Sequence, residues 1–271
     1  MTNRISVALV GAGAMGGALL RGWLNAKTID PAISAIFDPA PDAAMKKLAK
    51  ASGLALNPSP ADVSVNAMVL AIKPQVAASV LPPYAKIARS AVVISVMAGT
   101  SLASIGRALA NPPRVARAMP NLPASIGAGV TGLYAPATVA APARDVVDRL
   151  MSATGETVWV DSEKEIDFVT AVSGSGPAYF FLLTEALAEA GASLGLGREA
   201  ALRLARATAS GAGALLISDP RSPADMRKTV TSPGGTTAAA LSVLDGDSKA
   251  LRLLMKEAVA AAARRAGELT D

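Results

Sequence analysis

Short hydrophobic runs rich in β-branched residues alternate with helical periodicity over the first part of the chain. These runs predict strands at 5–10, 33–37, 67–72, 92–96 and 115–118, with further short strands near 129–134 and 157–160. Helices are predicted between them at about 14–26, 42–51, 75–88, 101–109 and 142–153. Alternating strands and helices are typical of a parallel sheet flanked by helices, so the pattern predicts an α/β domain.

Strand patterns stop after about Asp161, and only helical patterns follow. Helices are predicted at 177–195, 198–217, 223–229, 236–244 and 247–267. Pro177 comes after Ser175 and Gly176, and proline is favoured in the first turn of a helix, so this helix is expected to begin there. The predicted organisation is a parallel-sheet domain at residues 1–161 followed by an all-α domain at residues 162–271.

The helix predicted at 177–195 is apolar nearly all round in its first two turns, where Tyr179 is followed by two phenylalanines and two leucines. A helix without a polar face is buried on all sides. One subunit of this size can hardly cover such a helix, so we expect a helical interface between the subunits of an obligate oligomer.

Two residue types that often carry chemistry are missing, because the 271 residues include no cysteine and no histidine. Disulfides, a thiolate nucleophile, a Ser–His pair and a zinc site of the usual ligands are therefore excluded. A small all-oxygen Mg²⁺ or Ca²⁺ site is the alternative left open, but no EF-hand or P-loop spacing supports one, so no metal is expected.

The formal charge of +5 comes from scattered Lys and Arg residues, and aromatic residues make up only 3% of the chain. No nucleic-acid partner is expected, because a basic arm and stacking side chains are both lacking. Glycines interrupt the apolar start of the chain, and glycine or proline breaks the other long uncharged stretches. We therefore expect no signal peptide and no membrane span, and a cytoplasmic location.

A Gly-x-Gly-x-x-Gly motif lies between the first predicted strand and the first predicted helix. Its first glycine permits a tight turn, its second lets a pyrophosphate approach the backbone, and its third allows close packing of helix and strand. The N–H groups and the dipole of the helix then bind the phosphates. The motif predicts a Rossmann-type dinucleotide domain, the alternative being a turn without a ligand, with the cofactor on Gly11, Ala12, Gly13, Ala14, Met15 and Gly16.

Asp38 ends the second predicted strand, where dinucleotide-binding domains place an acid that reads the ribose. A carboxylate there accepts hydrogen bonds from the 2′-hydroxyl of NAD and repels the 2′-phosphate of NADP. The residue therefore favours NADH. The alternative is that Asp38 only caps the turn before Pro39.

Other candidate residues follow later strands, because strand carboxyl ends face the ligand crevice in such sheets. Ala71, Lys73 and Pro74 are expected to border the cofactor, although Lys73 could be an ordinary surface lysine. The segment "VMAGTS" closes the next strand in the same way. Asn121, held between two prolines, could touch the nicotinamide or only cap its loop.

The segment "VTSPGGTTAAAL" at 230–241 predicts a turn followed by the start of a helix, and no histidine, cysteine or carboxylate lies beside it in the sequence. Its first free N–H groups belong to about Gly235, Thr236 and Thr237, and together they form an anion site suited to a carboxylate. The Thr237 hydroxyl can add one hydrogen bond. Hydride delivery to a protonated imine fits these groups, whereas reduction of a carbonyl would need a proton donor.

With "GAGAMGGAL", "LAIKPQ", "RAMPNLP", "DFVTAVSGSGPAYFF" and "VTSPGGTTAAAL" in this order, the chain resembles the pyrroline-5-carboxylate reductase family over nearly its whole length. The resemblance implies a Rossmann domain, a helical dimerisation domain that forms a homodimer, and often a larger assembly of dimers, up to a decamer. It also implies hydride transfer from NADPH or NADH to a small imino acid, 1-pyrroline-5-carboxylate, giving L-proline.

The resemblance also carries over residue roles. It implies that the substrate carboxylate is gripped by Ser232, Gly234, Gly235, Thr236 and Thr237, with Thr237 contacting the ring nitrogen. It places Ser175 and Gly176 in the substrate pocket with Glu163 nearby, although Glu163 alone reads equally well as a capping or surface residue. Ala98 joins the cofactor residues. Many members follow the second strand with residues suited to NADPH, whereas this chain has Asp38 and Pro39, so the cofactor preference stays open.

Two rival interpretations remain. A 3-hydroxyacid dehydrogenase of the 6-phosphogluconate dehydrogenase type would share the glycine motif, but it would need a catalytic lysine at the start of the helix, where "GSGPAYFF" has none. A non-catalytic NAD(P)-binding sensor would keep the glycine turn and could lose the Thr237 constellation.

Overall fold

The computed structural model describes residues 4–270. Internal contacts divide the chain into two compact units, one formed by Met1–Ser175 with Ala262–Asp271 and the other by Gly176–Ala261. The predicted domain ends at residues 1 and 271 lie outside the described part of the chain. The division into contact units does not test the predicted domain boundary at residue 161, which stays a prediction.

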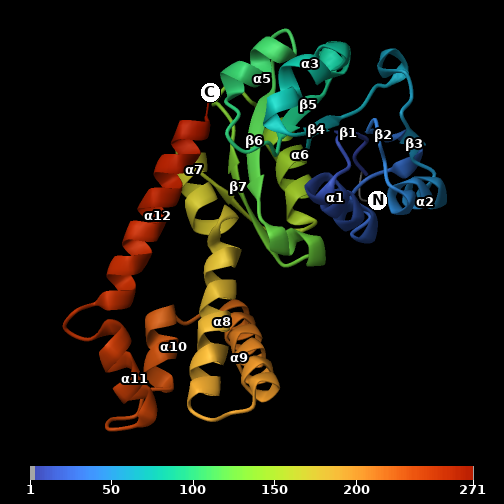
Figure 1. Cartoon of the computed structure of the whole chain (residues 1–271). Coiled ribbons are helices and arrows are strands. Elements are labelled where there is room, and N and C mark those ends of the chain that lie inside the picture. The colour runs from blue at the N-terminus through green and yellow to red at the C-terminus, as the bar shows by residue number, and fades with distance from the viewer. Residues whose placement is uncertain (1–3, 271) are drawn as a thin grey trace. The chain divides into compact units, whose positions relative to one another are not determined.

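The first unit is built on one sheet, whose strands within residues 4–270 run in the order β3-β2-β1-β4-β5-β6-β7-β8 (Figure 1). The strands are β1 (Val7–Val10), β2 (Ala35–Phe37), β3 (Ala55–Leu56), β4 (Ala67–Leu70), β5 (Val92–Ser95), β6 (Val115–Pro120), β7 (Gly129–Tyr134) and β8 (Gly155–Trp159). Neighbouring strands pair in parallel except β6 and β7, which are antiparallel. This parallel-dominated sheet confirms the predicted α/β class.

Two hydrophobic clusters show that both faces of the sheet are buried. Leu9 of β1 belongs to one cluster, whereas Ala8 and Val10 belong to the other. Strands buried on both faces read as continuous hydrophobic runs, which is why the sequence revealed them. The helices of this unit are α1 (Ala14–Asn25), α2 (Ala43–Ser52), α3 (Ala77–Val80), α4 (Ala85–Ser90), α5 (Leu102–Ala108), α6 (Ala141–Ser152) and α7 (Glu165–Val169).

Two local predictions for this unit were wrong. The helix expected at 75–88 is divided into α3, α4 and two 3-10 turns, Pro74–Val76 and Pro82–Tyr84. Proline has no N–H and clashes with the preceding turn, so the adjacent Pro82 and Pro83 interrupt the helix. The strand β3 was missed because two residues are too short to produce a pattern.

The second unit contains α8 (Gly176–Ser193), α9 (Arg198–Ser218), α10 (Pro223–Thr229), α11 (Thr236–Asp245) and the first part of α12 (Ala250–Leu269). A π-helical segment, Thr170–Gly174, follows α7, and a bend at Ser175 separates it from α8. Pro177 is the second residue of α8, so the prediction that this helix begins at the proline is confirmed to within one residue. The last residues of α12 return to the first unit.

The α8 helix leaves most of its apolar side chains uncovered. Phe180, Phe181 and Leu182 are 64%, 60% and 65% exposed. By length and composition, the helical run Glu165–Ser193 is long and apolar enough to cross a membrane, and 22% of its most apolar window is buried. A single chain thus leaves a large apolar surface on this helix without a partner.

Candidate functional site

The turn after β1 has the geometry that its glycines predict. Gly11 has a φ of +92°, its N–H donates to the carbonyl of Phe37 at 2.8 Å, and a Cβ there would lie 2.6 Å from the carbonyl oxygen of Ala71. A Cβ at Gly16 would overlap the carbonyl oxygen of Gly11. Only glycine fits at these two positions, because α1 and β4 approach the turn closely.

Gly13 differs from its neighbours, because a Cβ there would meet nothing within 4 Å. It is the N-cap of α1 and offers no side-chain cap, and the helix begins its bonding with Gly17 N–H donating to Gly13 O at 2.8 Å. The amides of Ala14, Met15 and Gly16 precede that bond, so they have no carbonyl partner inside the helix. Open space beside free amides fits the pyrophosphate of a dinucleotide.

Asp38 lies at the end of β2 beside this turn. Its Oδ2 accepts the Ala12 N–H at 2.8 Å, and its Oδ1 accepts the Ala40 N–H at 2.9 Å. Asn57 holds the Asp38 backbone on both sides, since its Oδ1 accepts the Asp38 N–H and its Nδ2 donates to the Asp38 carbonyl, both at 2.8 Å. The carboxylate therefore caps the turn, as the alternative interpretation expected, and it also lies against the glycine turn.

Sequence reasoning missed Asn57, which follows the short β3. Its φ is +53°, a conformation that asparagine tolerates better than most residues. An asparagine one residue after a strand was the available signal, and it is a weak one.

The residues predicted from later strand ends lie on the same edge of the sheet. Ala71 follows β4, and its N–H donates to the Val10 carbonyl at 2.8 Å. Lys73 has an exposed side chain, and Pro74 begins a 3-10 turn. Ala98 is exposed in the loop after β5. A Cβ on its neighbour Gly99 would lie 2.7 Å from the carbonyl oxygen of Leu269, so the end of α12 packs against this loop.

Asn121 and Glu163 both have protein partners within the first unit. Asn121 Oδ1 accepts the Val130 N–H at 3.0 Å, and its Nδ2 donates to the Ser173 carbonyl at 3.1 Å. Glu163 Oε1 accepts the N–H of Leu102, the first residue of α5, at 2.7 Å and lies 3.4 Å from Nη1 of the buried Arg117. Each side chain therefore has a structural role there. Arg117 was missed because its strand position gives no sign that this buried side chain pairs with Glu163.

In the second unit, the turn before α11 is shaped by its own sequence. The Gly235 N–H donates to the Ser232 carbonyl at 3.0 Å, and Gly234 has a φ of +70°, which together with Pro233 gives a type II turn. The first bond of α11 runs from Ala239 N–H to Gly235 O at 3.1 Å.

The free amides of α11 are therefore those of Thr236, Thr237 and Ala238, which precede its first bond. The sequence placed them one residue earlier, at Gly235 to Thr237, because it did not reveal that the turn uses the Gly235 N–H. No side chain caps this helix, so a ligand oxygen has donors to bind. The anion site predicted for this segment stays a prediction.

The remaining predicted residues, Ser175 and Gly176, follow the π-helical segment. The Ser175 N–H donates to the Thr170 carbonyl at 2.8 Å, a bond five residues long. Gly176 is buried, and a Cβ there would meet nothing within 4 Å. Within residues 4–270, no group of three or more Asp and Glu side chains could hold a metal ion.

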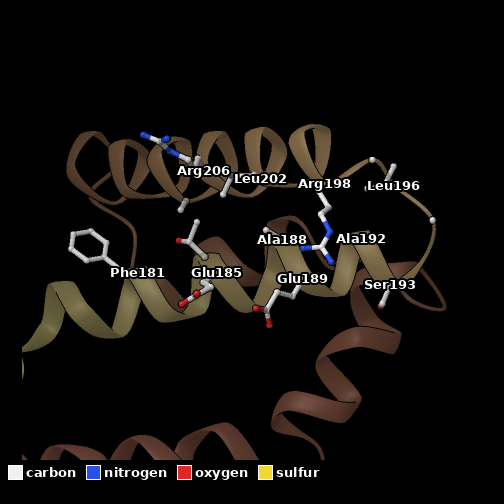
Figure 2. A pocket seen from close by; sticks show the side chains of 14 residues that line it. Phe181, Glu185, Ala188, Glu189, Ala192, Ser193, Leu196, Arg198, Leu202 and Arg206 are labelled. Carbon is white, nitrogen blue, oxygen red and sulfur yellow. The ribbon is translucent and has the colours of Figure 1, made fainter.

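A cavity of ≈1390 Å³ lies along α8 and α9 in the second unit. Figure 2 shows that α8 contributes Phe181, Glu185 and Glu189, whereas Arg198 and Arg206 come from α9. None of the predicted site residues lines it. The cavity therefore does not include the anion site predicted at α11.

Two family models match the chain. Residues 163–269 match the model described as "Pyrroline-5-carboxylate reductase dimerisation", and residues 6–99 match the model described as "NADP oxidoreductase coenzyme F420-dependent". The first covers the helical part of the chain, and the second covers the glycine turn with the strands that follow it. These matches agree with the predicted order of a dinucleotide domain and a dimerisation domain.

Individual proteins are similar over the full length. The chain is 39% identical to a pyrroline-5-carboxylate reductase from Pseudomonas aeruginosa, covering 98% of this chain and 97% of that protein. The structure of the reductase from Coxiella burnetii aligns with a TM-score of 0.91 at 34% identity, covering 99% and 100% of the two chains. The structure from Plasmodium falciparum, with NADP bound, aligns with a TM-score of 0.81 at 27% identity, covering all of both chains. The chain therefore belongs to the pyrroline-5-carboxylate reductase family.

Proposed function

We propose that this protein reduces 1-pyrroline-5-carboxylate to L-proline with NADPH or NADH, the last step of proline biosynthesis. The observation that carries the proposal is the entrance of α11, where a glycine-rich turn precedes three amides without helical partners. Such amides favour a carboxylate. In a chain of this family, the carboxylate of the imino acid is the natural ligand for them.

The proposed substrate residues have separate roles. Ser232, Gly234 and Gly235 shape the turn, and the amides of Thr236 and Thr237 hold the carboxylate. The Thr237 hydroxyl bonds to the ring nitrogen and orients the C=N bond. Ser175 and Gly176 line the pocket, and Glu163 lies near it. The reduced nicotinamide supplies a hydride to the imine carbon, and the chain needs no acid or base for this because the imine arrives protonated.

The proposed cofactor site is the glycine turn with residues 11–16, bordered by Asp38, Ala71, Lys73, Pro74, Ala98 and Asn121. The free amides at the start of α1 would hold the pyrophosphate. Residues 1–161 form the proposed dinucleotide-binding domain, and residues 162–271 form the proposed substrate and dimerisation domain. The glycine geometry and the family of the chain support this assignment.

The proposed oligomer is a homodimer formed through the helical domain, with further assembly of dimers up to a decamer. The exposed apolar side chains of α8 support this proposal, and the cavity along α8 and α9 offers a place for a second copy. We propose a cytoplasmic protein without a membrane or nucleic-acid partner. In this account, the apolar face of α8 meets another subunit instead of lipid.

Steady-state kinetics with NADH and NADPH, with and without pyrroline-5-carboxylate, tests the activity. Oxidation of either cofactor that depends on the imino acid is expected. Tight cofactor binding without turnover would favour the sensor, and turnover of a 3-hydroxyacid instead would favour the dehydrogenase.

Thr237→Ala tests the residue that orients the imine. It should lower kcat/KM about tenfold or more, the effect of losing one oriented hydrogen bond of about 1.4 kcal/mol. Thr237→Ser should recover most of the loss because it keeps the hydroxyl. Thr229→Ala is the matched control, since the hydroxyl of Thr229 bonds to its own helix at the Met226 carbonyl. Equal kinetics for the two alanine variants would remove Thr237 from the mechanism.

A further inference from the structure

The side chain of Asn57 extends the hydrogen-bond ladder between β2 and β3 beyond the ends of both strands. The Ala55 N–H donates to the Ser34 carbonyl at 3.3 Å. The Asn57 N–H donates to the Ile36 carbonyl, the next of this series, at 2.7 Å. The following carbonyl of the series belongs to Asp38, and it accepts the side-chain Nδ2 of Asn57 at 2.8 Å. A side-chain amide therefore supplies the bond that a backbone N–H would supply if β3 were longer.

The backbone at Asn57 leaves the path of the strand. Its φ is +53°, which departs from the extended conformation, and Pro58 follows it. The side-chain Oδ1 accepts the Asp38 N–H at 2.8 Å, so one planar amide meets both the N–H and the carbonyl of the same residue. Only one orientation of the amide satisfies both groups, because Oδ1 accepts and Nδ2 donates. Asn57 thus fixes the backbone of Asp38 through two bonds.

The carboxylate of Asp38 is fixed as well. Its Oδ2 accepts the Ala12 N–H at 2.8 Å, and its Oδ1 accepts the Ala40 N–H at 2.9 Å. These bonds use two of the roughly four acceptor positions that a carboxylate offers, so both oxygens can still accept from hydroxyl groups. Because Ala12 belongs to the glycine turn, the charge of Asp38 has a defined position beside that turn. A hydrogen bond to a ribose hydroxyl depends on this position, since it weakens steeply when its angle departs from linearity.

We propose that Asn57 is a positioning residue for cofactor selectivity, which holds the Asp38 carboxylate where it accepts the ribose hydroxyls of NADH and repels the 2′-phosphate of NADPH. The proposal rests on the proposed function, because that function places the cofactor on the glycine turn. Asn57 acts through Asp38 and needs no contact with the dinucleotide. Its loss should therefore affect the two cofactors unequally, whereas the loss of a residue that only stabilises the fold would affect them alike.

Asn57→Gly tests the proposal, because glycine readily adopts a positive φ and the substitution removes only the side-chain amide. The Kd values for NADH and NADPH are measured by nicotinamide fluorescence without the imino acid. Asn57→Gly should lower the ratio of the NADPH Kd to the NADH Kd about fivefold, less than the roughly tenfold change expected for Asp38→Asn. In the Asp38→Asn background, Asn57→Gly should change this ratio less than about twofold, because the charge that it positions is gone.

Asn66→Gly is the matched control. Asn66 is also exposed, and its Oδ1 accepts the Ser6 N–H at 3.0 Å, but this bond lies at the amino ends of β1 and β4. The ratio should stay within about twofold of the wild-type value in this variant. If Asn57→Gly is too unstable to measure, Asn57→Ser replaces it, because serine is shorter and carries no amide.

Equal changes in both Kd values for Asn57→Gly would overturn the proposal, and so would a shift that simply adds to that of Asp38→Asn in the double variant. Binding is measured without turnover, so the outcome does not depend on which substrate is reduced. A wild-type protein that binds both cofactors and does not reduce the imino acid would refute the proposed function alone. Failure of the proposed function and failure of this proposal are therefore distinguishable.

Discussion

Phe180→Ala should weaken the association of subunits, because Phe180 lies on the apolar face of α8 that one chain does not cover. Its side chain is 64% exposed in the single chain. The three residues that follow it are also exposed and apolar. Four consecutive helical residues point around the whole circumference of α8, so α9 alone cannot cover them.

The size of the effect follows from the exposed area. A phenylalanine side chain offers roughly 200 Å², so a residue that is 64% exposed leaves about 130 Å² for a partner to cover. At about 25 cal/mol per Å², covering this area stabilises each protomer by about 3 kcal/mol, and a symmetric dimer contains it twice. Alanine keeps part of the contact, so we expect a loss of about 3 kcal/mol per dimer, or roughly 100-fold in Kd.

Sedimentation with fluorescence detection over a dilution series would measure the dissociation constant. Ile126→Ala is the matched control, because Ile126 is 81% exposed but belongs to the first unit. The same Kd for wild type, Phe180→Ala and Ile126→Ala would refute the assignment of α8 to a subunit interface. A wild-type protein that stays monomeric in buffer and floats with lipid vesicles would assign the face to a membrane.

Three further predictions concern the cofactor turn and a surface ion pair. Gly13→Ala should leave the urea midpoint unchanged and raise the Kd for NAD(P)H about tenfold, because its Cβ enters open space beside the helix amides; Gly16→Ala should lower the midpoint itself, because its Cβ overlaps backbone. Asp38→Asn should shift the ratio of KM values for NADPH and NADH about tenfold toward NADPH, because it removes the charge that repels a 2′-phosphate. Arg221 hydrogen-bonds to Asp219 and lowers the pKa of its carboxyl group from 3.8 to about 2. The pair therefore stabilises the fold above about pH 4, and this effect is lost as the pH falls toward 2. Asp219→Asn should lower the urea midpoint at neutral pH, and the difference from wild type should shrink in acid.

The sequence predicts features whose cause is local. The strands of the first unit appear as apolar runs because both faces of the sheet are buried. The turn at Gly11 and the turn before α11 were predictable because glycine and proline restrict the backbone within a few residues. The roles of the candidate site residues stay predictions, since local geometry alone does not establish what they bind.

Features caused by tertiary contacts were not predictable in the same way. Asn121 reads as a nicotinamide contact or as a loop cap, and only the structure shows that its amide joins the backbone of Val130 to that of Ser173. Asp38 reads as a ribose ligand or as a cap, and only the structure shows that its carboxylate holds amides on two sides. The sequence pattern also gives no sign that Leu269 packs against the loop at Gly99.

The absence of histidine and cysteine matters less than it first suggests, because the groups proposed to act here are backbone amides and the hydroxyl of Thr237. The helix amides at α1 and α11 and the hydroxyl of Thr237 keep the same hydrogen-bonding character across the physiological pH range, unlike imidazole. Their effect depends on direction, and direction depends on backbone fixed by glycine and proline. Such a site depends on the accurate placement of its donors and does not depend on side chains with shifted pKa values. This explains why its candidate residues are mostly small and uncharged.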